Sequence, residues 1–267
     1  MADTLLHITL ANRIAQHSRL PDTLKRIITM FPDDFAMGSV LFDLPFYNHL
    51  LRTGIETLRH KPLTYHPFGQ AVHEIDGRTL CIQLLHRAEN DAEHTLALGA
   101  LTHFAVDLVF HKEIEHRIQG STISHDELER QIGLHCHYDL LGHSGVGTPY
   151  ARDITFLFPS SHWSKFVSSA FRSLFTATPA PDQFTQWQRS FRVFGFLYSK
   201  PYFPWLRTLA PDDPQLAQRS LELMHDSIEL GASFLTFAYD VVQQKISLED
   251  LTAALPPKRM SDGSDMK

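Results

Sequence analysis

Hydrophobic residues recur at intervals of three and four along most of the chain, and no stretch alternates apolar and polar positions as a strand does. This spacing predicts an all-α fold. The expected helices cover residues 3–18, 21–30, 77–89, 92–118, a segment from 125, a segment within 159–175, and 211–245. Residues 31–50 predict an ordered loop that opens a helix, and residues 60–69, with two prolines and a glycine, predict a loop.

Capping residues predict where two of these helices begin. Ser124 is a plausible N-cap for a helix beginning at His125, and Asp213 precedes Pro214 at the first position of another. We interpret residues 1–255 as one all-helical domain, a multi-helix bundle whose C-terminal half (150–250) is also helical. The last twelve residues, PPKRMSDGSDMK, predict a disordered tail over 256–267.

Composition narrows the class of protein. The net charge of −6, without any block of like charge, argues against a nucleic-acid partner. Only two cysteines, no secretory signal and no apolar run of about 18 residues predict a cytoplasmic protein without a transmembrane segment. Of 17 histidines, 15 fall at or before His143, so we expect the polar chemistry in the N-terminal half.

The stretch LTHFAVDLVFH, residues 101–111, places three polar residues inside an otherwise apolar helix. His103, Asp107 and His111 recur at every fourth position, so each side chain lies about 40° round the helix from the one before. All three therefore face one small volume. Burying an unpaired carboxylate costs several kcal/mol, and imidazole and carboxylate at this spacing can share a divalent zinc ion. Together with a second His-x3-Glu pair, His125 and Glu129, the stripe favours a metal site over a satisfied polar core.

Other polar residues accompany this stripe. His125 and Glu129 share one helix face, and His7, Asp43 and His66 stand among apolar or Pro-flanked neighbours. Two further histidines of the long helix, His94 and His116, lie about 180° and 220° from His103 and should face away. For His135, His137 and His143 an accessory site remains an alternative to the favoured polar surface.

Taken together, the residues resemble the zinc-dependent phospholipase C family, whose domain is shared with glycosylphosphatidylinositol-specific phospholipase D and related to single-strand-specific zinc nucleases. The resemblance covers residues 3–135 and rests on His7 in an N-terminal helix, GSVLFDLP around Asp43, a histidine before a helix, GALTHFAVDLVFH and HDELE. It implies a core cluster of two or three Zn²⁺ ions. Asp43, His66, His103 and Asp107 would hold one ion, His111, His125 and Glu129 a second, and His7 with Asp107 a third.

The sequence departs from the family pattern at three points. Phe42 stands where the family usually has Pro before the acid. The match at His66 is loose, and His73 in AVHEI is an alternative ligand. Secreted members use their mature N-terminal amine as a ligand, whereas here the amine of Ala2, after removal of Met1, would have to fold back toward His7. This last departure bears mainly on the third ion.

The function implied is a metal-dependent phosphoester hydrolase, a phospholipase C-like phosphodiesterase acting through metal-activated water on a small phosphodiester or phospholipid. Asp43 is the candidate catalytic residue, orienting the water. Seven aromatic residues between 191 and 205 suggest either a wall for a lipid tail or ordinary helix packing, and packing is favoured.

Two other classes of protein stay open. An HD-type phosphohydrolase needs adjacent His and Asp ligands, and His125 and Asp126 form such a pair. A non-catalytic protein of the same fold would keep the metals, or only the fold, as a scaffold for binding. Metal content and turnover would separate these alternatives.

Overall fold

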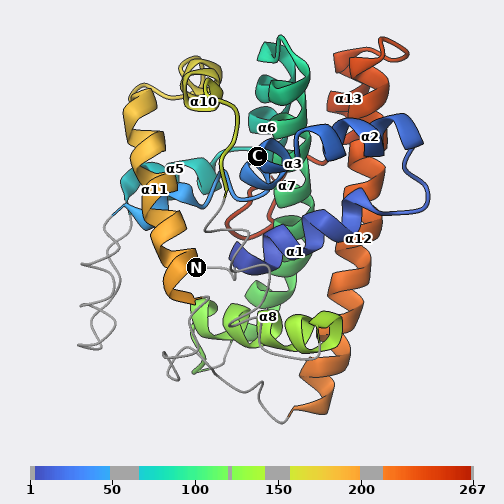
Figure 1. The fold of residues 1–267 in the computed structure, drawn as a ribbon. Coiled ribbons are helices and arrows are strands. Elements are labelled where there is room, and N and C mark those ends of the chain that lie inside the picture. The colour runs from blue at the N-terminus through green and yellow to red at the C-terminus, as the bar shows by residue number, and fades with distance from the viewer. Residues whose placement is uncertain (1–3, 49–65, 120–121, 142–156, 199–212, 266–267) are drawn as a thin grey trace.

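The computed structural model describes residues 4–48, 66–119, 122–141, 157–198 and 213–265. Every regular element in these ranges is a helix, which confirms the all-α prediction. The elements, labelled as in Figure 1, are α1 (Thr4–Ala15), α2 (Asp22–Met30), α3 (Pro32–Gly38), η1 (Leu44–Tyr47, a 3-10 helix), α5 (Pro67–Glu74), α6 (Gly77–Arg87), α7 (Asp91–Ile118), α8 (His125–Leu141), α10 (Trp163–Phe171), α11 (Pro181–Tyr198), α12 (Pro214–Val242) and α13 (Leu248–Ala254).

Helix α7 is the central element of the bundle. It runs through the middle of the molecule in Figure 1 and contacts α1, α3, α6, α8 and α12. Every residue from Thr95 to Leu108 is buried, so this part of the helix has no solvent-facing side. A helix enclosed in this way can carry polar side chains only if they find partners inside the protein.

Two glycines let α3 and α7 pack backbone against backbone. A Cβ atom on Gly99 would collide with the carbonyl oxygen of Phe35, and one on Gly38 would collide with the carbonyl oxygen of Leu96. Because neither residue has a side chain, the two helices approach more closely than other residues would allow. This contact holds Ser39 and the turn that carries Asp43 against the middle of α7.

Both predicted caps are present. The Ser124 hydroxyl accepts a hydrogen bond from the Glu127 backbone N–H at 3.3 Å. The Asp213 carboxylate accepts from the N–H groups of Gln215 and Leu216 at 3.0 and 2.9 Å, with Pro214 at the first helical position. These side chains satisfy N–H groups that have no partner within the helix. The predicted helix starts at His125 and Pro214 are confirmed.

Two predicted loops contain helices. Residues 31–50 were expected to be a loop opening a helix, but they already include α3 and η1. Helix α5 begins at Pro67, inside the segment 60–69 that was expected to be a loop. The backbone N–H at the first position of a helix has no partner within the helix, so proline, which has no N–H, is well suited to that position. Pro32 and Pro67 therefore begin helices.

The predicted disorder of residues 256–267 is wrong for residues 256–265. Met260 is fully buried in the main hydrophobic cluster. The Gly77 N–H donates to the Lys258 carbonyl at 3.0 Å, and residues 76 and 259 form an isolated β-bridge. Main-chain hydrogen bonds and the burial of one methionine order this segment. Its polar composition indicates neither of them.

The aromatic segment 191–205 is only partly within the described residues. Phe191 is buried and its ring lies 4.8 Å from that of Tyr47, which is ordinary helix packing. Residues 199–212 lie outside the described ranges. No helix in the described part of the chain is long and apolar enough to cross a membrane.

The contact between α3 and α7 generates the first prediction. Gly99→Ala should lower the free energy of unfolding by roughly 3 kcal/mol or more, because the methyl group meets a main-chain carbonyl that cannot move alone. The matched control is Gly231→Ala in α12, where the new methyl meets the Ile14 side chain instead of a main-chain carbonyl. Its cost should be smaller, because the terminal carbon of Ile14 can shift more easily than the backbone and alanine favours a helix over glycine by about 1 kcal/mol. Equal stability of the two variants in urea unfolding would contradict this account.

Candidate metal centre

The stripe on α7 forms the middle of a buried polar cluster. His103, Asp107 and His111 are all buried, as their four-residue spacing predicted. His103 Nε2 lies 3.0 Å from Asp107 Oδ2, and His111 Nε2 lies 3.9 Å from Asp107 Oδ1. The carboxylate therefore stands between two imidazoles of its own helix. His116 is exposed and His94 half-buried, and neither belongs to the cluster.

Three groups of side chains in the described part of the chain have the composition and spacing to hold a metal ion. Within each group the ligand atoms lie within 4.8 Å of one another. The first group is His7, His103 and Asp107; the second is Asp43, His73 and His103; the third is His111, His125 and Glu129. The groups are continuous, because His103 belongs to two of them and Asp107 also contacts His73 and His111 at 3.9 Å.

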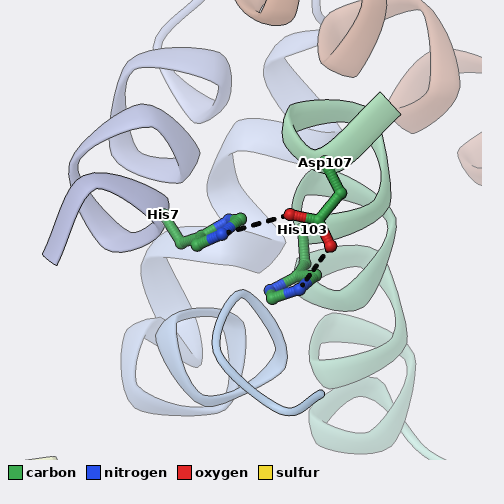
Figure 2. A group of neighbouring side chains, drawn as sticks. All are labelled: His7, His103 and Asp107. Atoms are coloured by element: carbon green, nitrogen blue, oxygen red, sulfur yellow. Dashed lines mark ion pairs between the residues drawn. The ribbon is translucent and has the colours of Figure 1, made fainter. Parts of the chain in front are cut away.

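The first group joins the N-terminal helix to the centre of the bundle. His7 projects from α1 toward the two α7 side chains (Figure 2). Its Nε2 lies 3.3 Å from Asp107 Oδ1, and its ring stacks on that of His103 with centroids 4.0 Å apart. Both imidazoles therefore approach the same carboxylate, one through each oxygen atom (Figure 2).

The second group is assembled from three separate segments. Asp43 comes from the turn between α3 and η1, His73 from the last turn of α5, and His103 from α7. Asp43 Oδ1 lies 3.4 Å from His73 Nε2 and 3.9 Å from His103 Nε2. The third group lies nearest the solvent: His111 Nε2 and Glu129 Oε1 are 3.0 Å apart, and the His125 side chain is 28% exposed.

Four of the histidines are oriented by a bond on the outer side of the ring. His73 Nδ1 bonds to the carbonyl of Gly69 at 2.8 Å, and His103 Nδ1 to that of Ser39 at 2.9 Å. His125 Nδ1 lies 2.9 Å from the Glu115 carboxylate, and His111 Nδ1 contacts the carbonyl of Met260. Because each Nδ1–H is donated outward, each Nε2 is directed into the cluster. This is the usual arrangement of metal-binding histidines.

Several atoms inside the cluster have unmet bonding capacity. Among the described residues, His7 Nδ1, His103 Nε2 and Asp107 Oδ2 are buried without a hydrogen bond of good geometry. Buried polar atoms nearly always have such a partner. Imidazole nitrogens and carboxylate oxygens converging in this way suit a divalent cation such as zinc. The residues present therefore fit the metal that the sequence predicted.

Burial and charge act in opposite directions on the pKa values of the cluster. Burial alone would lower the pKa of His103 and His111. The carboxylate of Asp107 outweighs this effect, together with Asp43 at His103 and Glu129 at His111, and raises the two values to about 9 and about 10. Burial alone would raise the pKa of Asp43, but His103 and His73 lower it to about 2. The pKa of Asp107 is held well below its usual value by His103 and His111. The carboxylates are therefore ionised at neutral pH.

His66, one of the sequence-predicted ligands, lies apart from all three groups. It is the N-cap of α5, where its Nδ1 accepts from the Phe68 N–H at 3.1 Å, and its ring contacts that of Trp187. His73, the alternative considered from the sequence, belongs to the second group instead. The other predicted ligands, namely His7, Asp43, His103, Asp107, His111, His125 and Glu129, are all members of the groups.

A sequence signal for His73 exists once α5 is known to be a helix. Phe68, Gly69 and Val72 are buried, and His73 continues that face four residues after Gly69. The loop expected over residues 60–69 hid this pattern. Among the accessory candidates, His135 is half-buried and belongs to none of the groups, while the His137 side chain and His143 lie outside the described residues.

The comparison with known families fits this geometry. The model of the family described as zinc-dependent phospholipase C matches residues 6–178. The chain belongs to the zinc-dependent phospholipase C family. The match includes α1, the Asp43 turn, α5, α7 and α8, and therefore every member of the three groups. No curated protein and no solved structure matches the chain. Membership and the three groups together support a zinc hydrolase at the level of the family.

His73 and His66 generate the second prediction. His73→Ala should lose about one equivalent of bound zinc, because it removes a buried member of the second group. His66→Ala is the matched control: it deletes the same side chain from the same helix, removes a cap, and should keep the full metal content. Elemental analysis after gel filtration gives the answer. If His66→Ala loses metal and His73→Ala does not, the second group must be redrawn around His66.

The raised pKa values of His103 and His111 generate the third prediction. After chelator treatment both rings should be protonated at pH 7.5, so zinc must displace about two protons when it binds. Calorimetric titration in buffers of different ionisation enthalpy measures this number. Zinc affinity should rise with pH up to about 9 to 10.

The stability of the chelator-treated protein should change in the opposite direction. A raised histidine pKa stabilises the fold fully below the unfolded value of about 6.5 and ceases to do so as pH rises through the folded value. The free energy of unfolding should therefore fall between pH 6.5 and 10. Zinc binding without proton release would show that the rings are neutral beforehand.

Proposed function

We propose that the protein is a phospholipase C-like phosphodiesterase that uses two or three zinc ions held by the three groups. The observation that carries this proposal is the continuity of the groups around Asp107, whose carboxylate contacts histidines of all three. Ions held there would be close neighbours. Adjacent zinc ions lower the pKa of bound water and stabilise the charge that develops on a phosphoryl group during displacement.

Asp43 would have two roles, as a ligand of the second group and as the residue that orients water. Asp43 presents Oδ1 to His73 and His103, while its Oδ2 lies 4.0 Å from His7 Nε2. Its low pKa keeps it ionised at neutral pH. We assign to Asp43 the orientation of the attacking water, which it would do by accepting a hydrogen bond on a carboxylate oxygen.

The gradient of burial indicates where a substrate enters. His103 is fully buried, whereas His125 and its partner Glu115 are 28% and 36% exposed. The phosphoryl group of a small phosphodiester or phospholipid would therefore approach from the His125 side. The net charge of −6 makes nucleic acid an unfavourable substrate.

The fourth prediction tests this activity. Zinc-loaded protein should hydrolyse bis-(p-nitrophenyl) phosphate and short-chain phosphatidylcholine, and a chelator should abolish both activities. His125→Ala should reduce turnover on the order of 100-fold, since it removes a member of the solvent-facing group. His116→Ala, an exposed histidine of α7 outside the groups, is the matched control and should retain full activity.

Three results would count against the proposal. Cleavage of single-stranded DNA without phosphodiester or phospholipid turnover would assign the protein to the nuclease branch. Full zinc content without turnover of either substrate would favour a non-catalytic metal-binding role. Loss of activity in His116→Ala equal to that in His125→Ala would place the reactive face of α7 elsewhere.

A further inference from the structure

The C-terminal segment lies against the candidate metal centre. After α13 the chain returns toward α7 (Figure 1). There Gly263 packs beside Lys112 and the carbonyl of Leu108. The side chain of Met260 is fully buried and adjoins Gly77 at the start of α6. Residues 258–264 are thus fixed to both α6 and α7. We call these residues the C-terminal clamp.

Main-chain hydrogen bonds give the clamp a defined shape. The Arg259 N–H donates to the Ser264 carbonyl at 3.1 Å, and the Gly263 N–H donates to the Arg259 carbonyl at 3.0 Å. Gly263 has a φ of 64°, in the left-handed region that glycine adopts without strain. These bonds form a tight turn, so the groups at its start are held in fixed directions.

Two adjacent backbone groups of the clamp reach two residues of the metal centre. The Met260 carbonyl accepts from His111 Nδ1. The next backbone N–H, that of Ser261, donates to the carbonyl of His73 at 3.0 Å. His73 and His111 belong to different groups and to different helices, α5 and α7. One peptide unit therefore joins the second group to the third.

The clamp lies outside residues 6–178, the part of the chain that the family model matches. The three other oriented histidines use partners within that range, namely Gly69, Ser39 and Glu115. His111 alone among these four takes its outer partner from the C-terminal end of the chain. Without that bond, the contact between Nε2 and Glu129 would be left to orient the ring.

We propose that the C-terminal clamp is a positioning element for metal binding at the third group. By accepting the Nδ1–H of His111, the Met260 carbonyl fixes the ring with Nε2 directed at Glu129, 3.0 Å away. The inference rests on the metal-binding part of the proposed function and not on the reaction. Bonds of this kind typically contribute 10- to 100-fold to metal affinity.

A backbone ester tests the proposal without changing any side chain. Semisynthesis can replace the amide between Met260 and Ser261 by an ester, which weakens the carbonyl as an acceptor and removes the Ser261 N–H. Zinc affinity, measured by chelator competition, should fall about 10-fold for one equivalent only. The matched control is an ester between Ser261 and Asp262, because the Ser261 carbonyl and the Asp262 N–H form no main-chain hydrogen bond within the described part of the chain. It should bind zinc as the all-amide protein does.

Nuclear magnetic resonance of histidine rings labelled with ¹⁵N identifies the equivalent that weakens. The ester should release the metal from His111 and His125 first, while His73 and His103 stay bound. A loss confined to His73 and His103 would overturn the role given to Met260. Equal weakening of every equivalent, with lower stability of the chelator-treated protein, would show a purely structural contribution and overturn it also.

Two point substitutions at Gly263 test the same proposal without semisynthesis. Gly263→Val and Gly263→Asn each add a Cβ atom near Lys112, but valine strongly disfavours a positive φ whereas asparagine tolerates it. Valine should weaken one zinc equivalent and asparagine should largely restore it. Equal affinity in all these proteins would overturn the clamp alone. If the all-amide protein bound no zinc, the metal-site proposal would fail, and the role of the clamp with it.

Discussion

The buried carboxylate of Asp107 is the constraint around which the rest of the structure is arranged. It sits in the fully enclosed part of α7, where an isolated negative charge would cost several kcal/mol. Four imidazoles surround it, at distances between 3.0 and 3.9 Å, and they come from α1, α5 and α7. These helices must therefore meet at one point. Their apolar faces supply the packing energy, but the carboxylate determines which of their residues end up adjacent.

Close packing of α3 against α7 fixes the positions of these side chains. The contact of Gly38 with Gly99 brings the chain after α3 so close to α7 that the Ser39 carbonyl reaches His103 Nδ1 at 2.9 Å. The same approach fixes the start of the turn that presents Asp43. Sites built on rigid elements hold their ligands more accurately than sites built on free loops. The polar centre thus depends on a contact made by two residues that have no side chain.

The sequence predicted the candidate ligands that follow a four-residue spacing within one helix. It missed the features that depend on main-chain contacts between distant segments. The stripe of His103, Asp107 and His111 follows from helical geometry alone, and the pair of His125 and Glu129 does too. The choice between His66 and His73 depended on whether Pro67 ends a loop or begins a helix. The order of residues 256–265 depended on main-chain bonds to Gly77 and His73, and backbone groups are alike in every sequence.

The pairing of carboxylates with imidazoles also affects whether the fold would depend on a bound metal. Small zinc domains fold only with their metal, because without it they lack sufficient apolar burial. Here α7 contributes to two hydrophobic clusters that contain residues of many other helices, so the bundle has a core of its own. Protonated His103 and His111 supply two positive charges beside the carboxylates of Asp43, Asp107 and Glu129. Protons and metal ions are thus alternative counter-charges for one buried acidic centre. A metal that binds there would replace these protons in a core that is already packed, provided that the histidine rings are held in place.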